Sequence, residues 1–484
     1  MQKQGVPTLP HSWLFGHLAL MAKFRQEHPP DVNIFQLHYW FLNELDRLFP
    51  GEKIVPPIIY LDLWPFTSSS LLLSTHPAVS TQFTQTRNLI KAKVHTDFLK
   101  PLTENKDIIS LHGEEWKSWR SKLQPGFNRH NLMVLLPDLM DEVVIFVDLL
   151  GSLAGKDGQW GEVFRLEEKT MNLTFDVIHR ALTGSQLNQQ TSCSDTPLKS
   201  ALLDQLDQMG RSGANPARGF FHLLTLLPTA IVRNNRVMNS VYGHKIQEWL
   251  SDGSRSRNIP SIIDRTLEII DLEGPLNGDG TNLAAFVDGF TSNLKALLFA
   301  GHDTTSTTIC WMFKELQDNP VCLERLREEH DTVFGTEIGA CQELILNSPH
   351  LLYALPYTLA IIKETLRLYP LAATMRQGSS DYLLTVPGSR IRYPTDGYAM
   401  WDAVPIIHSR PDVWRQADKF LPERWLVPEG DPLRPSKDAW RPFSLGPRIC
   451  IGLELALLEL RLVLVFVVRK FDIEEAWTKW DTKK

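Results

Sequence analysis

The chain is poor in cysteine and has no surplus of positive charge, and each shortage excludes a class of protein. Its five cysteines are scattered and form no CxxC pair, so neither a disulfide framework nor a cysteine-based zinc site is expected. The 50 Lys and Arg against 56 Asp and Glu give a net charge of -6, which argues against a nucleic-acid partner. The cysteines are Cys193, Cys310, Cys322, Cys341 and Cys450.

Long hydrophobic runs are also missing near both ends of the chain. The longest strongly apolar one, Leu462 to Val468, is far shorter than the roughly 20 residues of a membrane span. Met1 to Gly5 form no signal-peptide core, and a proline-punctuated lead-in follows within residues 1–20. We therefore expect an intracellular chain without a transmembrane segment, in which the sequon Asn172-Leu173-Thr174 is accidental.

Apolar residues, by contrast, are abundant. Of the 484 residues, 43% are hydrophobic, so the chain is globular rather than disordered. Length alone would suggest about three domains. Apolar residues at three- and four-residue spacing predict helices at Leu132–Leu153 and Leu283–Gln317, with exposed loops at Gly184–Leu198 and Ser251–Pro260.

A strand-rich stretch lies at Tyr382–Tyr398, where Pro387-Gly388 and Asp396-Gly397 are turn signals. The sequence has no internal repeat, and no break in charge or composition divides it. These patterns favour one mainly α domain with a small β portion.

The most informative segment is FSLGPRICIG, residues 443–452, and the apolar helix predicted after it, which ends near Arg469. Cys450 lies where this turn enters the helix, and the helix dipole there favours a thiolate. Such a thiolate could be a nucleophile, a metal ligand or a haem ligand, although an isolated cysteine is more often a buried structural residue. Gly446 and Arg448 favour a functional cysteine, because they allow a flat ligand to approach and supply a fixed cation.

This segment resembles the haem-binding loop of cytochromes P450, whose pattern is Phe-x-x-Gly-x-Arg-x-Cys-x-Gly. Phe443, Gly446, Arg448, Cys450 and Gly452 match its fixed positions. The resemblance implies that the cofactor is haem b, that Cys450 is the axial thiolate on its iron, and that Arg448 pairs with a haem propionate. Phe443 and Gly446 are then part of the cofactor-binding loop. A thiolate ligand pushes electron density onto iron and favours O–O cleavage.

A second motif lies in the helix around Ala300-Gly-His-Asp-Thr-Thr305, which carries a run of hydroxyl side chains. Ser and Thr weaken a helix and can bond back to the carbonyl one turn earlier. A helix–helix contact through small residues would explain the segment equally well. The segment resembles the Ala/Gly-Gly-x-Asp/Glu-Thr-Thr/Ser element of the distal haem helix. That resemblance implies that Asp303 and Thr304 are the catalytic acid–alcohol pair that guides protons to bound dioxygen.

Glu364 and Arg367 lie at i, i+3 in a helix entered by Pro356 and stopped before Pro370. An isolated pair of this kind is usually a surface salt bridge worth a few tenths of a kcal/mol, roughly. The pair resembles the family's Glu-x-x-Arg helix, and the later Pro-Glu-Arg element contains Arg424. The resemblance implies a structural network of these three residues that braces the cysteine loop.

Haem carries two propionates, so cations should gather at its edge. Trp116 and Arg120 lie one helical turn apart and share a face, which alone would more often mean packing with a solvated head group. They resemble the family's Trp-x-x-x-Arg helix, and Arg376, in a strand-like stretch after Pro370, fits the family's third arginine. The resemblance implies that all three bind the haem propionates.

The resemblance covers nearly the whole chain and implies a single cytochrome P450 domain over residues 1–484. Microsomal relatives have a membrane helix before the lead-in and a further C-terminal β-hairpin, and we expect this chain to lack both. The implied enzyme is a haem-thiolate monooxygenase. Electrons from NADPH arrive through NADPH-cytochrome P450 reductase, and one atom of O2 enters a lipophilic substrate. We further expect a monomer with peripheral membrane contact at the endoplasmic reticulum surface.

The chain looks most like microsomal P450s of filamentous fungi, so we expect a polyketide- or terpenoid-derived substrate and a role in secondary metabolite biosynthesis. The family places pocket-forming stretches near His95–Ser110, Leu206–Leu227, Ala296–Thr304 and Ala372–Met375. Two other functions stay open. One is a P450-fold isomerase or dehydratase that uses haem without external electrons, and the other is a non-catalytic haem-binding protein.

Overall fold

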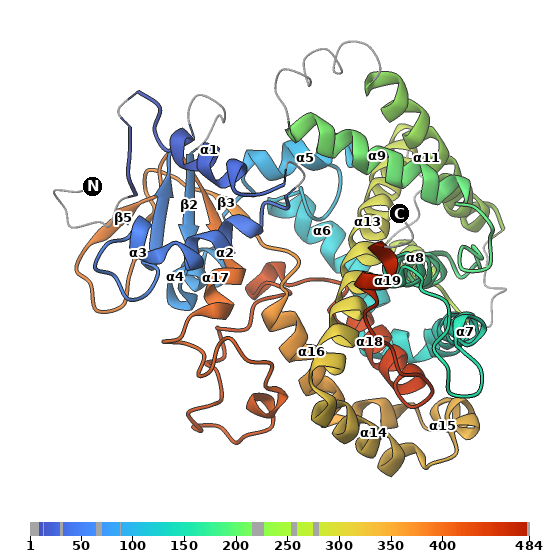
Figure 1. Ribbon diagram of the computed structural model, residues 1–484. Coiled ribbons are helices and arrows are strands. Elements are labelled where there is room, and N and C mark those ends of the chain that lie inside the picture. The colour runs from blue at the N-terminus through green and yellow to red at the C-terminus, as the bar shows by residue number, and fades with distance from the viewer. Residues whose placement is uncertain are drawn as a thin grey trace. The chain divides into compact units, whose positions relative to one another are not determined.

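The computed structural model describes residues 9–12, 14–29, 32–63, 70–87, 89–214, 227–252, 259–273 and 280–481. The chain folds into two compact units. Unit 1 comprises Met1–Thr96 and Lys363–Cys450, and unit 2 comprises Asp97–Ile362 and Ile451–Lys484. Figure 1 shows the helices and strands of both.

Unit 1 holds the β portion of the described chain. Its elements are α1 (Leu18–Gln26), α2 (Gln36–Asn43), α3 (Leu45–Leu48), β1 (Ile58–Leu61), β2 (Ser70–Ser74), α4 (Pro77–Thr81), the π-helix η2 (Gln82–Thr86), β3 (Met375–Gln377), β4 (Leu383–Thr385), β5 (Arg392–Pro394), β6 (Tyr398–Asp402), α17 (Val404–Ser409), and the short 3-10 helices η6 (Pro422–Trp425) and η7 (Gly446–Arg448). Two helices, α5 (Lys93–Thr103) and α16 (Pro356–Leu368), contain points where the chain passes from one unit to the other.

Four strands form one sheet in the order β1-β2-β6-β3, with β2 and β6 parallel and the other pairs antiparallel. The predicted strand-rich stretch supplies β4, β5 and the start of β6, and Gly388 and Gly397 lie in its turns at a φ of 77°. The strands β1 and β2 were not predicted. Every residue of β1 is buried, so its sequence has no alternation of apolar and polar residues to mark it as a strand.

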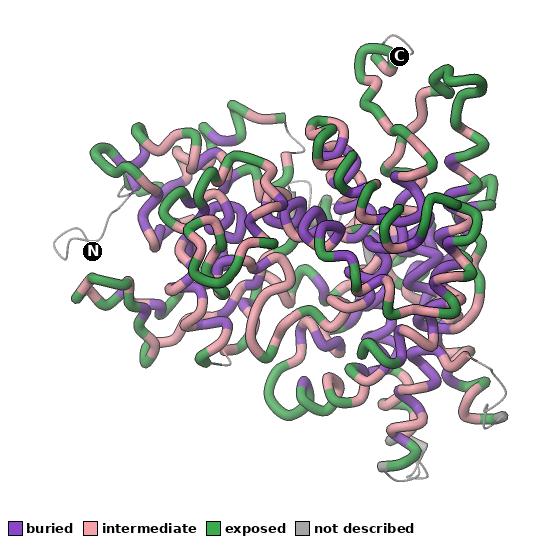
Figure 2. Tube along the Cα trace, turned by 90° about the horizontal axis from the view of Figure 1, so that it is seen from below, coloured by how far each residue is buried: buried purple, intermediate pink, exposed green. Residues whose placement is uncertain are grey.

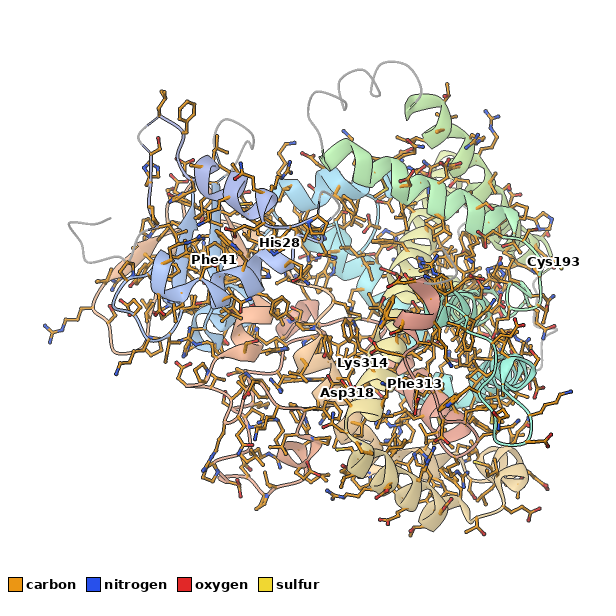
Figure 3. The ribbon with its side chains drawn as sticks, viewed as in Figure 1. His28, Phe41, Cys193, Phe313, Lys314 and Asp318 are labelled. Carbon is orange, nitrogen blue, oxygen red and sulfur yellow. The ribbon has the colours of Figure 1, made fainter. Side chains whose placement is uncertain are left out.

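Aromatic side chains pack the sheet of unit 1 against its first helices. Phe24 on α1 and Trp40 and Phe41 on α2 form one buried cluster with Leu61 and Leu73 of the sheet. Figure 3 labels Phe41 among these residues. The cluster holds the sheet that carries β3, and thus positions Arg376.

The regular elements of unit 2 are all helices among its described residues, and loops join them. Its elements are α6 (Gly113–Leu123), η3 (Gln124–Phe127), α7 (Arg129–Leu153), α8 (Leu166–Thr183), α9 (Pro197–Ala214), α11 (Leu227–Asp252), α12 (Ile262–Glu273), α13 (Gly280–Asp318), α14 (Pro320–Phe334), η4 (Ile338–Ala340), α15 (Cys341–Asn347), η5 (Pro349–Tyr353), α18 (Leu453–Val467) and α19 (Trp477–Asp481). The core lies where α7, α8, α13 and α18 pack on one another, and the buried parts of the trace in Figure 2 follow such long helices.

The predicted helices and loops of unit 2 are confirmed where the structure describes them. The periodic stretches 132–153 and 283–317 lie within α7 and α13, and the loop at 184–198 joins α8 to α9. The helix after Gly452 is α18, which ends at Val467, just short of its predicted end. Most of the predicted loop at 251–260, and most of the pocket stretch at 206–227, lie outside the described residues.

One part of α13 resembles a membrane span by length and composition. Among the described helices, Leu283–Asp318 contains a window with a mean hydropathy of 1.2, and 56% of that window is buried. A core helix passes the same test, so this finding is weak evidence for a span.

A buried acidic cluster between α7 and α8 predicts that stability falls as pH rises. Burial and the negative charge of Asp176 raise the pKa of Glu142 to about 7, although Arg180 lies 3.2 Å from its carboxylate. The folded chain therefore keeps a proton on Glu142 that the unfolded chain releases near its ordinary pKa of 4.5. Between these two values the folded state binds more protons, so its free energy of unfolding decreases with pH.

Replacing the carboxylate removes this pH dependence. We expect Glu142→Gln to gain about 1–3 kcal/mol relative to the wild type between about pH 5 and pH 8, measured from urea unfolding midpoints. Glu168→Gln, on the exposed side of α8, is the control. Its free energy of unfolding should depend on pH as that of the wild type does. If the free energies of unfolding of Glu142→Gln and the wild type change with pH in the same way, the raised pKa of Glu142 is wrong.

Candidate haem site

The segment that carries Cys450 is a closed loop at the end of unit 1. The amide of Cys450 donates to the carbonyl of Phe443 at 2.9 Å, and the amide of Ile449 donates to that of Gly446 at 3.0 Å. Cys450 is exposed, and it lies three residues before the start of α18, at the turn into the helix that the sequence predicted. The loop therefore presents a thiol from a backbone that is already fixed by its own hydrogen bonds.

Gly446 is required by the contact between this loop and η2. Its φ is +78°, and a Cβ at this position would lie 2.6 Å from the carbonyl oxygen of Thr84 and 2.9 Å from Cα of Gln85. Both neighbours are backbone atoms, so a larger residue would push the loop away from η2. The glycine thus lets the cysteine loop lie directly on the backbone of unit 1.

A buried cation lies on β3. Arg376 is 1% exposed and donates to the hydroxyl of Thr374 at 2.8 Å and to the carbonyl of Met375 at 3.3 Å. Within the described residues no carboxylate forms an ion pair with it, and burial lowers the pKa of its guanidinium to about 10. A buried guanidinium with neutral partners is suited to an anionic group such as a carboxylate.

Of two residues beside Arg376, the sequence analysis missed Lys91 and named His95 only as the start of a pocket-forming stretch. Lys91 donates to the same Thr374 hydroxyl at 3.1 Å, and residue 91 forms a β-bridge with residue 376. Burial, together with the charges of Lys91 and Arg376, lowers the pKa of His95 to about 3, so its imidazole is neutral. No motif marks these residues, and only the pairing of backbone segments brings them together.

In unit 2, α6 carries Trp116 and Arg120 on one face, as predicted. Trp116 is 7% exposed, and the Nε of Arg120 donates to the side chain of Gln124 at 3.2 Å. The helix thus holds an indole N–H donor and a guanidinium one turn apart.

The acid–alcohol pair lies in the middle of α13. Asp303 is exposed, and Thr304, which is half-buried, donates its hydroxyl to the carbonyl of Ala300 at 3.0 Å. Ser306 and Thr308 also bond back, donating to the carbonyls of Asp303 and Thr304. The sequence analysis expected such bonds from hydroxyls to carbonyls about one turn earlier.

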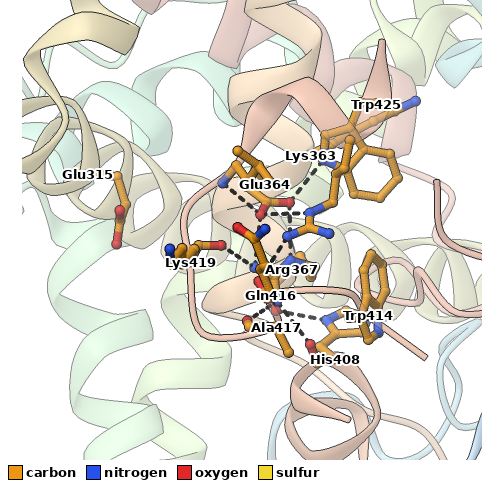
Figure 4. Close-up of polar contacts among 12 residues, drawn as sticks. Glu315, Lys363, Glu364, Arg367, His408, Trp414, Gln416, Ala417, Lys419 and Trp425 are labelled. Atoms are coloured by element: carbon orange, nitrogen blue, oxygen red, sulfur yellow. Dashed lines mark hydrogen bonds and ion pairs between the residues drawn. The ribbon is translucent and has the colours of Figure 1, made fainter. Parts of the chain in front are cut away.

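The predicted network around Glu364 is confirmed, and it is buried rather than exposed. The Glu364 carboxylate accepts from Nη2 of Arg367 at 2.8 Å and from Nε of Arg424 at 3.0 Å, and all three side chains are 0% exposed (Figure 4). It also accepts from the indole of Trp425 and from the amide of Leu421, both at 3.0 Å. The two arginines use their remaining donors on backbone carbonyls of residues 408, 415, 416, 417 and 419.

This network reaches the start of the cysteine loop through His408. Its Nδ1 lies 2.9 Å from the carbonyl of Arg367, and its Nε2 accepts from the amide of Arg441 at 3.0 Å. Burial and the charge of Arg367 lower the pKa of His408 to about 3, so the ring is neutral with its proton on Nδ1. Arg441 in turn donates to Asp402 at 2.9 Å. The brace predicted for the cysteine loop therefore exists in unit 1.

The residues of the candidate site fit haem. Cys450 carries a thiol on a closed loop, Gly446 allows a close backbone approach, and Arg376 is a buried cation. A thiol and a cation are the kinds of group that haem iron and a propionate take as partners. Phe443 packs against Trp440 at 5.9 Å between ring centroids, and Arg448 is half-buried at the end of η7. These residues lie in unit 1, whereas Trp116, Arg120, Asp303 and Thr304 lie in unit 2.

Comparison with known proteins gives a consistent result. The family model described as Cytochrome P450 matches residues 60–483. The cytochrome P450 monooxygenase polC of Polytolypa hystricis is 34% identical over 100% of this chain and 84% of its own length. The cytochrome P450 monooxygenase acrF of Aspergillus aculeatus is 29% identical, over 87% of this chain and 85% of its own. A bifunctional cytochrome P450/NADPH--P450 reductase of Aspergillus oryzae is 26% identical, over 85% of this chain and 36% of its own.

A mainly α fold with small sheets and a cysteine on a closed loop is compatible with a haem-thiolate protein, since a cysteine thiolate is one of the ligands that hold haem iron. The chain belongs to the cytochrome P450 family. It is a haem-dependent oxidoreductase of the monooxygenase type, as the sequence predicted.

Proposed function

We propose that Cys450 is the axial ligand of the haem iron in this monooxygenase. The observation that carries the proposal is the closed loop of residues 443–450, which presents an exposed cysteine from a backbone held on η2. When bound, haem supplies the activation of O2, and a thiolate ligand favours cleavage of the O–O bond. The chain's own residues hold the cofactor, order the loop and deliver protons.

We assign four side chains as partners of the haem propionates, namely those of Trp116, Arg120, Arg376 and Arg448. Each supplies N–H donors, and the arginines supply positive charge for carboxylates. The buried guanidinium of Arg376, which has a hydroxyl and a carbonyl as partners, supports this assignment most directly. Phe443 and Gly446 shape the loop itself. We also propose that residues 1–484 form one P450 domain, because the family match runs through the sequences of both units.

Asp303 and Thr304 deliver the protons. The Thr304 hydroxyl is held by the Ala300 carbonyl, and the exposed carboxylate of Asp303 adjoins it in the chain. Reduction of O2 by two electrons and two protons gives hydrogen peroxide, whereas four of each cleave the O–O bond and give water. The share of NADPH that ends in peroxide therefore reports proton delivery even without a substrate.

Thr304→Ala is expected to raise the ratio of peroxide formed to NADPH consumed by at least about threefold, because the hydroxyl that guides the proton is lost. The ratio is measured without substrate, with NADPH-cytochrome P450 reductase and O2. The carbon monoxide difference spectrum should stay that of a thiolate-ligated haem. Thr307→Ala, three residues further along the same helix, is the control. An unchanged ratio for Thr304→Ala would remove Thr304 from the proton path.

The substrate is proposed to be a lipophilic polyketide- or terpenoid-derived compound of fungal secondary metabolism. The apolar stretch from Ala296 to Phe299, before the acid–alcohol pair, supports a lipophilic ligand. The proposed electron donor is NADPH-cytochrome P450 reductase, since one relative carries both activities by name in one chain. We also propose that the chain acts as a monomer at the surface of the endoplasmic reticulum.

A further inference from the structure

The helix that carries the acid–alcohol pair is in direct contact with α8. A Cβ on Gly301 would lie 2.8 Å from Cγ1 and 3.0 Å from Cδ1 of Ile178, so the side chain of Ile178 fills the place that a larger residue would need. The ring of Phe175 also packs edge-on against His302, with 5.6 Å between ring centroids. The backbone of α13 is thus touched by α8 immediately before Asp303.

A polar contact crosses this surface at His302. The hydroxyl of Thr174 on α8 donates to the carbonyl oxygen of His302 at 2.6 Å, and Thr174 is 0% exposed. The sequence analysis treated Thr174 only as part of an accidental sequon. The structure shows that Thr174 and Asn172 are both buried, and that Asn172 accepts from Lys199.

The carbonyl that Thr174 holds belongs to the peptide plane that leads into the acid–alcohol pair. A peptide unit is planar and rigid, so the C=O of His302 and the N–H of Asp303 turn together. A hydroxyl that pulls this carbonyl towards α8 therefore sets the orientation in which the chain continues to Asp303 and Thr304. The imidazole of His302 does not hold this carbonyl, because its Nδ1 pairs with the carbonyl of Leu298 at 3.0 Å.

We propose that Thr174 is a positioning residue for proton delivery: its hydroxyl holds the His302 carbonyl and thereby the backbone that presents Asp303 and Thr304. The inference rests on the proton path proposed for those two residues. It adds Thr174, which lies on another helix and touches neither cofactor nor substrate in the proposed path. Thr174 acts through the peptide between His302 and Asp303.

The test compares substitutions on one face of α8. Thr174→Val keeps the shape of the side chain and removes its hydroxyl, and Thr174→Ser restores a hydroxyl. Thr170→Val is the matched control, because Thr170 lies one turn earlier, also contacts α13, and faces Cys310 rather than the acid–alcohol pair. If Thr174→Val does not bind haem, Thr174→Ala removes the same hydroxyl in its place.

Two measurements distinguish positioning from general destabilisation. The first is the peroxide-to-NADPH ratio of the haem-loaded chain with reductase and O2 and without substrate. We expect Thr174→Val to raise it about two- to tenfold, from the loss of one buried hydrogen bond. Thr174→Ser and Thr170→Val should stay near the wild type. The second is amide hydrogen exchange in Phe299–Thr308, which should become faster in Thr174→Val and stay unchanged in Thr170→Val.

The outcomes separate the inference from the proposed function. A wild-type ratio in Thr174→Val, beside a raised ratio in Thr304→Ala, overturns the role of Thr174 and leaves the proton path intact. Equal increases in Thr174→Val and Thr170→Val also overturn it, because the effect is then not specific to His302. If Thr304→Ala leaves the ratio unchanged, the proton path is wrong and the inference falls with it.

Discussion

Cys450→Ala is expected to abolish the carbon monoxide difference band of a thiolate-ligated haem. The loop that carries Cys450 is closed by its own backbone bonds, so the substitution removes the ligand and leaves the loop in place. Two of the other cysteines, Cys310 and Cys341, are poor replacements. Burial raises the pKa of the Cys310 and Cys341 thiols, so they stay protonated, and only a thiolate binds iron in this way. Haem content and the reduced carbon monoxide spectrum are the measurements.

Two further substitutions control for the loss of any cysteine. Cys193 is exposed in the loop between α8 and α9 (Figure 3), and Cys341 is buried at the start of α15. Cys193→Ala and Cys341→Ala should both keep the thiolate band. A band that survives Cys450→Ala, or disappears in Cys341→Ala, would assign the ligand to another residue.

Glu364→Gln is expected to destabilise the chain by about 3–5 kcal/mol and to lower its haem content. The carboxylate of Glu364 is the shared partner of Arg367 and Arg424, and none of the three is exposed. A neutral amide leaves two buried guanidinium groups without a counter-charge, and such groups are costly to bury. The loss also reaches the cysteine loop, since His408 connects Arg367 to Arg441. Urea unfolding and haem titration measure both effects.

The chain offers a matched control for this substitution. Glu44 and Arg47 have the same i, i+3 spacing at 2.9 Å in unit 1, but their side chains are 31% and 35% exposed. Glu44→Gln should change the free energy of unfolding by at most about 1 kcal/mol, because exposed pairs contribute little. Similar small effects for both substitutions would show that the Glu364 network does not support the fold.

The sequence predicted the chemistry of the site better than its geometry. The cysteine loop, the acid–alcohol pair and the Glu-x-x-Arg helix could be found because each has a fixed spacing along the chain. The burial of Glu364 could not be read from that spacing, since the exposed pair Glu44 and Arg47 has the same one. Only the folded chain shows that the Trp425 indole donates to Glu364, and that backbone carbonyls of residues 408 and 419 accept from its partner Arg367.

Contacts between distant segments account for the other differences. The strand β1 has no alternating pattern, because all four of its residues are buried and its core cluster includes residues of α1, α2 and α17. Lys91 and Arg376 meet through a β-bridge, and Thr174 meets His302 across two helices that are more than a hundred residues apart in the chain. No local sequence pattern predicts these contacts. They follow from packing, which single-sequence periodicity does not describe.

The central claim is that the Cys450 thiolate ligates haem in this chain, and the carbon monoxide difference spectrum of the reduced protein tests it most directly. The spectrum is recorded for the wild type and for a chain in which Ala replaces Cys193, Cys310, Cys322 and Cys341 together. We expect both to show the band of a thiolate-ligated haem, because Cys450 alone supplies the ligand. A haem-loaded, folded wild type without that band would contradict the account.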